Sequence, residues 1–113
     1  MSELELDGSR ALYGRARQVL PGGVTASARL NPMLKHALMM QRGQGPYVWD
    51  VDGNRYIDYC LSHGASLLGH GHPAVVAAVQ EALEMGILCA YETEVQVSVA
   101  EQVLKLFPGM EML

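Results

Sequence analysis

Three histidines and one cysteine in a single short segment could bind a metal ion. They are Cys60, His63, His70 and His72. Thiolates and imidazole nitrogens are the ligands that zinc and copper prefer, and such a site needs three or four of them. Against this hypothesis, no carboxylate side chain lies between Cys60 and Pro73, and an H-x-H pair on its own is weak evidence. We therefore expect no bound metal, and a small His-based metal-binding module is kept as an alternative.

A second segment with possible chemistry is PGGVTASAR, residues 21–29. The backbone N–H groups of a glycine-rich turn can bind phosphate. However, no Gly-Lys-Ser/Thr sequence follows these glycines, which excludes a P-loop. Arg29, at the end of the segment, could bind a carboxylate through two parallel hydrogen bonds, although an isolated arginine is usually a solvated surface residue. The local pattern alone predicts only a helix stop followed by a loop.

The composition of the chain limits the classes of function. Its 113 residues are 50% hydrophobic and 18% charged, which is typical of a folded chain and not of a disordered one. The net charge is −4 with scattered basic residues, so we expect no nucleic-acid partner. No apolar run approaches the roughly 20 residues that cross a bilayer, and the acidic start lacks the pattern of a signal peptide. With two cysteines and no CxxC spacing, we expect reduced thiols, a cytoplasmic location and no membrane partner.

The first half of the chain predicts one helix and a small antiparallel sheet. Residues 9–19 place apolar side chains on one helical face, with Ser9 as a plausible N-cap. The proline and glycines of LPGG end this helix. Strand-like runs follow at residues 37–42 and 47–61. The second run contains Asp-Gly-Asn at 52–54, the strongest hairpin signal in the chain.

The second half predicts a loop and two helices. Residues 62–72 form a loop punctuated by glycines, and a helix follows over 73–86. Pro73 suits the first position of this helix, His72 its N-cap and Gly86 its C-terminal stop.

The last helix is expected over residues 93–107, and it opens with a capping box formed by Thr93 and Gln96. The apolar faces of the two helices leave a third hypothesis open, in which the chain is a non-catalytic fragment that only associates with a partner. The final FPGMEML resembles the start of a strand, which suggests an incomplete unit.

Several motifs together resemble the N-terminal part of the class III pyridoxal-phosphate aminotransferases, closest to their glutamate-1-semialdehyde aminomutase-like members. Their order and spacing agree with that family over about residues 9–113. The stretches that carry the resemblance are PGGV (21–24), RGQGPYVWDVDGNRYIDY (42–59), LGHGHP (68–73), TE and AE (93–94 and 100–101), and FPGMEML (107–113).

The resemblance implies an α+β segment that belongs to a pyridoxal-phosphate-dependent transferase of fold type I, an α/β architecture. Residues 1–61 would supply the substrate loop and the strands of the small domain, and residues 62–113 the crossing into the large domain. Pyridoxal 5′-phosphate would be bound mainly by residues outside this chain. No catalytic residue is expected here, since Lys35 and Lys105 do not match the position of the family's lysine. The rest of the enzyme would lie on another chain or be missing, and the complete enzyme would be a homodimer.

The resemblance also implies substrate-binding residues. Arg29 occupies the position that holds the substrate carboxylate, and Ser62 and His63 occupy the position that lines the substrate side chain. His63 replaces the aromatic residue that is usual there, and Ala26 stands where the aminomutases have serine. These departures make another amino acid plausible, such as a β-amino acid or a bulkier α-amino acid. Transamination, an intramolecular amino shift and racemisation all remain open.

Overall fold

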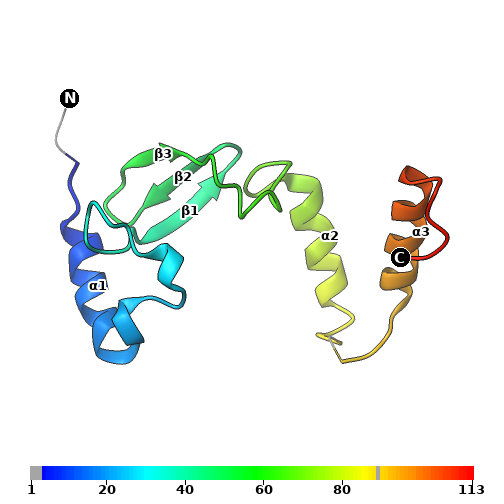
Figure 1. The fold of residues 1–113 in the computed structure, drawn as a ribbon, viewed down its shortest axis with the longest axis horizontal. Helices are drawn as coiled ribbons and strands as arrows, with labels where there is room; N and C mark the ends of the chain where they lie inside the picture. Colours follow the sequence, from blue (N-terminus) through cyan, green and yellow to red (C-terminus); the bar gives the residue numbers. More distant parts are fainter. Residues whose placement is uncertain (1–3, 89) are drawn as a thin grey trace. The chain divides into compact units, whose positions relative to one another are not determined.

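The computed structural model describes residues 4–88 and 90–113, so Cys89 lies outside the described residues. The chain divides into two compact units, one up to Val75 and the other from Val76 to Leu113. The elements, shown in Figure 1, are α1 (Asp7–Val19), the short 3₁₀ turns η1 (Pro21–Gly23) and η2 (Ser27–Arg29), β1 (Met40–Gln44), β2 (Tyr47–Asp50), β3 (Arg55–Ile57), α2 (Pro73–Leu83) and α3 (Glu94–Leu106).

The three strands form one antiparallel sheet in the order β1-β2-β3, which confirms the predicted small sheet. Gln44 pairs with Tyr47 across the first turn. Strand β1 begins and ends later than the predicted run 37–42, and the pairing shifts between Met40 and Arg42. The second turn lies at the predicted Asp-Gly-Asn, where Gly53 has a φ of 86°. Such a φ strains any residue with a Cβ, which explains the glycine.

The predicted N-cap of the first helix is wrong. Helix α1 begins at Asp7 with Leu6 at the N-cap position, and Ser9 lies fully buried inside its first turn. The capping group instead comes from the β2–β3 turn, where the Asp52 carboxylate accepts the N–H groups of Gly8 (2.5 Å) and Ser9 (2.9 Å). A carboxylate also interacts favourably with the positive end of the helix dipole, which a serine hydroxyl does only weakly.

The chain after α1 stops the helix as predicted. Gly22 and Gly23 have φ angles of 66° and 73°, which continue no right-handed helix. A Cβ on Gly23 would lie 2.7 Å from the Tyr13 ring, so this turn packs back against α1. The expected loop that follows contains η2 and leads into β1.

Helices α2 and α3 start where the sequence predicts. Pro73 is the first residue of α2, which ends at Leu83, and the Gly86 N–H then donates to the Leu83 carbonyl at 3.0 Å. Thr93 caps α3 through the predicted capping box with Gln96. Neither helix has a buried residue.

Among residues 4–88 and 90–113, the buried apolar side chains are Leu6 and Ala37. The same residues contain no helix with the length and hydropathy needed to cross a membrane. The described chain therefore has a small apolar core, and most of its large apolar side chains are exposed.

Candidate functional site

Asp50, which is fully buried, is the centre of a polar cluster. Its carboxylate accepts the backbone N–H groups of Asp52 (3.0 Å) and Asn54 (2.8 Å), the side-chain amide of Asn54 (2.9 Å) and the Tyr56 hydroxyl (2.6 Å). The Asn54 amide also donates to the Glu5 carbonyl. We call Asp50, Asn54 and Tyr56 the Asp50 cluster. It joins the N-terminal segment to the second hairpin.

The ionisation of the Asp50 cluster fits a structural role. Burial alone would raise the pKa of Asp50, but the hydrogen bonds from Tyr56 and Asn54 outweigh it and lower that pKa below the ordinary value. Burial, and then the hydrogen bond to Asp50, raise the pKa of Tyr56 to about 12. Near neutral pH Asp50 therefore stays ionised and Tyr56 stays protonated. Because neither group exchanges a proton there, neither suits acid–base catalysis.

A second cluster joins the end of β3 to the segment before α2. His70 Nε2 lies 2.7 Å from Asp58 Oδ2, and the two side chains are 22% and 16% exposed. Asp58 Oδ1 accepts the N–H groups of Cys60 (2.8 Å) and Leu61 (3.1 Å). The hydrogen bond from His70, followed by that from Leu61, lowers the pKa of Asp58, so this carboxylate stays ionised at neutral pH.

The two predicted substrate residues after β3 lie in an unusual turn. Leu61, Ser62 and His63 have φ angles of 45°, 54° and 58°, and Gly64 follows at 91°. Left-handed conformations are unfavourable for residues with a Cβ, and three in succession are rare. Ser62 and His63 are both exposed. The turn therefore presents two polar side chains to solvent from a backbone that needs external support.

Arg29 lies at a pocket of about 390 Å³ formed by α1, the turns after it and residues 37–40. Its Nη1 donates a hydrogen bond to the Thr25 hydroxyl. The other residues around the pocket are mostly apolar, namely Leu12, Ala16, Leu20, Gly23, Val24, Thr25, Ala37, Leu38, Met39 and Met40. Neither Ser62 nor His63 lines this pocket, so the described chain does not gather the three predicted substrate residues in one cavity.

The histidines do not form a metal site in the part of the chain that the structure describes. Within residues 4–88 and 90–113, no three His, Cys, Asp or Glu side chains are placed to hold a metal ion. His70 is bonded to Asp58. His72 directly precedes α2, as predicted, and its buried Nδ1 forms no hydrogen bond, so this atom does not cap the helix. The alternative of a metal-binding module therefore has no support in these residues.

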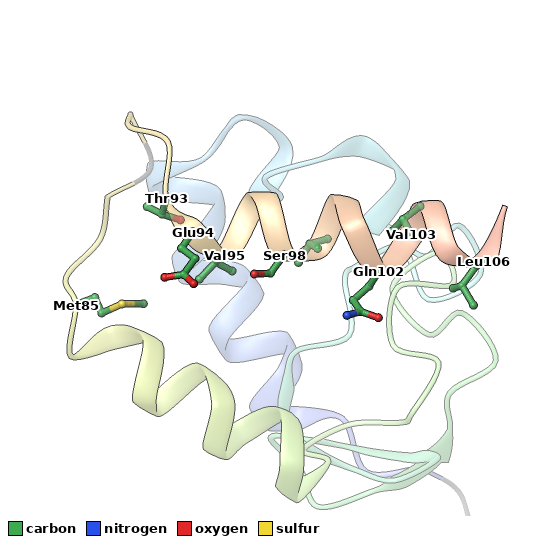
Figure 2. A pocket seen from close by; sticks show the side chains of 9 residues that line it. Met85, Thr93, Glu94, Val95, Ser98, Gln102, Val103 and Leu106 are labelled. Carbon is green, nitrogen blue, oxygen red and sulfur yellow. The ribbon is translucent and has the colours of Figure 1, made fainter. Parts of the chain in front are cut away.

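A separate groove of about 490 Å³ runs along α3. Figure 2 shows Val95, Ser98, Gln102 and Leu106 along one face of the helix, with Met85 beside its N-terminal end. None of the predicted substrate residues lines this groove. The groove is therefore not a second candidate for the substrate site. It lies on an exposed face of α3, which has no buried residue.

Sequence reasoning missed Asp58 and treated His70 only as a turn residue or a metal ligand. The signal that could have found Asp58 is an aspartate directly after a strand, where its side chain often bonds the N–H groups that follow. Its second partner, His70, lies twelve positions away, and no local pattern predicts that contact.

Comparison with known proteins identifies the relatives of this chain. A model of the family described as aminotransferase class-III matches residues 27–113. The glutamate-1-semialdehyde 2,1-aminomutase of Polaromonas naphthalenivorans is 47% identical over 104 residues, which are 91% of this chain and 24% of that protein. The protein of the same name from Methanothrix thermoacetophila is 40% identical over 110 residues, or 97% of this chain and 25% of the relative. The chain thus spans about a quarter of the length of these curated relatives.

Solved structures agree with the sequence comparison. A transaminase with PLP bound has a TM-score of 0.83 and 32% identity, covering 91% of this chain and 24% of that one. The β-phenylalanine aminotransferase of Variovorax paradoxus has a TM-score of 0.82 and 28% identity, covering 93% of this chain and 24% of that one. These neighbours confirm the expected fold, an α+β segment of a fold-type I transferase.

Proposed function

The chain belongs to the class-III aminotransferase family, and from this premise we propose that it forms the N-terminal part of a pyridoxal-phosphate-dependent aminotransferase or aminomutase. It spans about a quarter of its relatives, so the activity belongs to this segment together with the rest of such an enzyme. Within it, we assign residues 1–61 to the small domain and residues 62–113 to the crossing into the large domain. The assembled enzyme is proposed to be a cytoplasmic homodimer.

The described residues do not by themselves fit the cofactor. Pyridoxal phosphate needs a lysine for covalent attachment, an acid at the pyridine nitrogen and donors for its phosphate. The two lysines of this chain, Lys35 and Lys105, are both exposed. Neither lines the pocket beside Arg29 or the groove on α3. The cofactor is therefore assigned to the remainder of the enzyme, and no chemical step is assigned to a residue of this segment.

The proposed task of this segment is to bind the substrate carboxylate through Arg29. The observation that carries this proposal is an arginine at the edge of a pocket whose walls are mostly apolar. A guanidinium can form two parallel hydrogen bonds with a carboxylate, and the pair gains strength where apolar walls exclude water. The bond to the Thr25 hydroxyl orients the guanidinium before substrate arrives, which lowers the entropic cost of binding.

The proposed substrate is an amino compound that bears a carboxylate, with Ser62 and His63 lining its side chain. The Variovorax relative acts on a β-amino acid by its name, and the two sequence relatives described above are aminomutases by name. His63 and Ala26 depart from the aminomutase pattern, which favours an amino acid other than glutamate semialdehyde. A neutral or protonated imidazole at position 63 would suit a polar or aromatic substrate side chain.

The proposal is tested in the assembled enzyme with Arg29→Ala and Arg29→Lys. We expect KM for a carboxylate-bearing amino donor to rise by at least about tenfold in Arg29→Ala, as for loss of a charge-assisted bond. Arg29→Lys should raise KM less than Arg29→Ala does, since lysine keeps the positive charge but cannot form the two parallel hydrogen bonds of a guanidinium. KM for an amine without a carboxylate should not change.

Arg15→Ala is the matched control, because Arg15 is exposed on α1 and does not line the pocket. Cofactor loading, followed by its visible absorbance, should stay constant in all three variants. An equal loss of activity with both kinds of donor, or a loss of cofactor, would contradict the assignment of Arg29.

A further inference from the structure

The Asp58 side chain makes contacts on two sides. Its Oδ1 accepts the N–H groups of Cys60 at 2.8 Å and Leu61 at 3.1 Å, which lie at the entry of the left-handed turn. Its Oδ2 lies 2.7 Å from the Nε2 atom of His70. One carboxylate therefore connects the turn that carries Ser62 and His63 to the segment that leads into α2.

His70 is itself held in place by the first hairpin. Its backbone N–H donates to the Gly45 carbonyl at 2.9 Å, and its carbonyl accepts the Gly45 N–H at 2.8 Å. Its ring lies against Gly43, where a Cβ would come within 2.6 Å of the ring carbon Cγ. Because both its backbone and its ring are constrained, His70 is a fixed point to which Asp58 can be attached.

The turn needs such an attachment. Leu61, Ser62 and His63 all have left-handed φ angles, which are unfavourable for residues with a Cβ and persist only where the surroundings impose them. Inside the turn, the Leu61 carbonyl accepts the N–H groups of Gly64 and Ser66, both at 3.0 Å. These bonds close the turn but do not fix it to the sheet. The bonds from the Cys60 and Leu61 N–H groups to Asp58 fix the turn to the sheet, because Asp58 directly follows the last residue of β3.

We infer that Asp58 and His70 are positioning residues that hold the Leu61–Gly64 turn in the geometry that presents Ser62 and His63 to the substrate. This inference rests on the proposed function, which places those two side chains beside the substrate. Neither Asp58 nor His70 touches the substrate in this role. They act through the backbone of the turn, and the specificity of the enzyme depends on them indirectly.

The test uses the assembled enzyme and two readouts, hydrogen exchange in residues 60–66 and steady-state kinetics. Removing the charged acceptor in Asp58→Ala, or the donor in His70→Ala, should speed exchange at the Cys60 and Leu61 amides by about tenfold or more. KM for the amino substrate should rise by about the same factor, with kcat and cofactor absorbance changing by less than about twofold, since no group that contacts the reacting atoms is lost.

Two further variants keep the inference testable if the alanine variants fold poorly. In His70→Gln the side-chain amide can still donate to Asp58 Oδ2, so exchange and KM should return most of the way to wild type. Gly43→Ala leaves Asp58 and His70 intact but pushes the His70 ring aside, since its new Cβ would lie 2.6 Å from the ring. It should reproduce the His70→Ala effects. Tyr59→Phe, at a side chain that is 88% exposed, is the control and should change neither readout.

The outcomes separate this inference from the proposed function. If His63→Ala raises KM while His70→Ala changes neither exchange nor KM, the positioning role is overturned and the substrate role of the turn stands. If exchange rises in the Asp58 and His70 variants but neither they nor His63→Ala affects KM, the hold on the turn is supported and its substrate role is overturned. A change of KM without any change of exchange in residues 60–66 also overturns the inference.

Discussion

Replacing Tyr56 with phenylalanine removes one hydrogen bond to a buried carboxylate and leaves the rest of the Asp50 cluster in place. Asp50 keeps the N–H groups of Asp52 and Asn54 as donors. The pKa of Tyr56 rises from 10.0 to about 12. This rise means that the folded state favours the protonated phenol over the ionised one by at most about 2.7 kcal/mol more than water does. Burial contributes more to that rise than the hydrogen bond does, and solvent screens a partly exposed group. We therefore expect Tyr56→Phe to lower the free energy of unfolding by about 1–2 kcal/mol.

Urea unfolding at several pH values measures this difference. Because the folded pKa of Tyr56 lies above its unfolded value, the stabilisation is fully present below about pH 10 and is lost as pH rises through about 12. The difference in unfolding free energy between wild type and Tyr56→Phe should therefore shrink as pH rises above about 10.

The same replacement in an Asp50→Asn background isolates the pair. In this background Tyr56 loses its charged acceptor and keeps only a neutral amide partner, whose N–H can donate to the phenol oxygen, so Tyr56→Phe should cost less there. Tyr59→Phe is the exposed control and should stay within about 0.5 kcal/mol of wild type. The reasoning is refuted if Tyr56→Phe costs no more than this control, or if its cost is unchanged in the Asp50→Asn background.

Three other predictions concern α1 and the glycines. Asp52→Ala removes the carboxylate that caps α1, so hydrogen exchange at the Gly8 and Ser9 amides should speed up while the amides in the last turn of α1 are unaffected; equal acceleration along the helix would contradict a local cap. Gly14→Ala, in the middle of α1 where the new Cβ would meet nothing within 4 Å beyond the backbone of its own helix, should stabilise the protein by about 0.5–1 kcal/mol in urea unfolding. Gly69→Ala should destabilise it in the same assay, because the φ there is 80° and the Cβ would lie 2.9 Å from the Gly45 carbonyl group; a neutral result would contradict the packing at that turn.

Features set by neighbouring residues could be predicted from the sequence. The Asp-Gly-Asn turn, the Pro73 start of α2 and the capping box at Thr93 each depend on groups within a few residues of one another. The resemblance to known proteins added the family. It also supplied the site residues, and the role of Arg29 stays a prediction.

Features set by distant residues could not be predicted. Ser9 has the right chemistry for an N-cap, but Asp52, 43 positions later, accepts the Ser9 N–H. Ser9 itself is fully buried within the first turn of α1 and does not occupy the N-cap position. Local patterns assign His70 to a turn or a metal site. They do not reveal its partner Asp58, because Asp58 lies twelve positions earlier, directly after β3. In both cases a carboxylate outcompetes the local alternative, since a charged acceptor forms the stronger bond, and only the tertiary fold determines which donor it reaches.

The Asp52 cap has a consequence for the order of folding. The hairpin that carries Asp52 is closed by contacts between nearby residues, such as Asp50 with Asn54, and such local structures form within microseconds. The first turn of α1 needs a partner 43 to 44 positions away, so a long loop must close before that bond forms. During synthesis α1 leaves the ribosome before the hairpin, yet its N-terminal end is completed only after the hairpin has emerged. Mutations in the hairpin should therefore slow folding, whereas mutations at Gly8 and Ser9 should mainly speed unfolding.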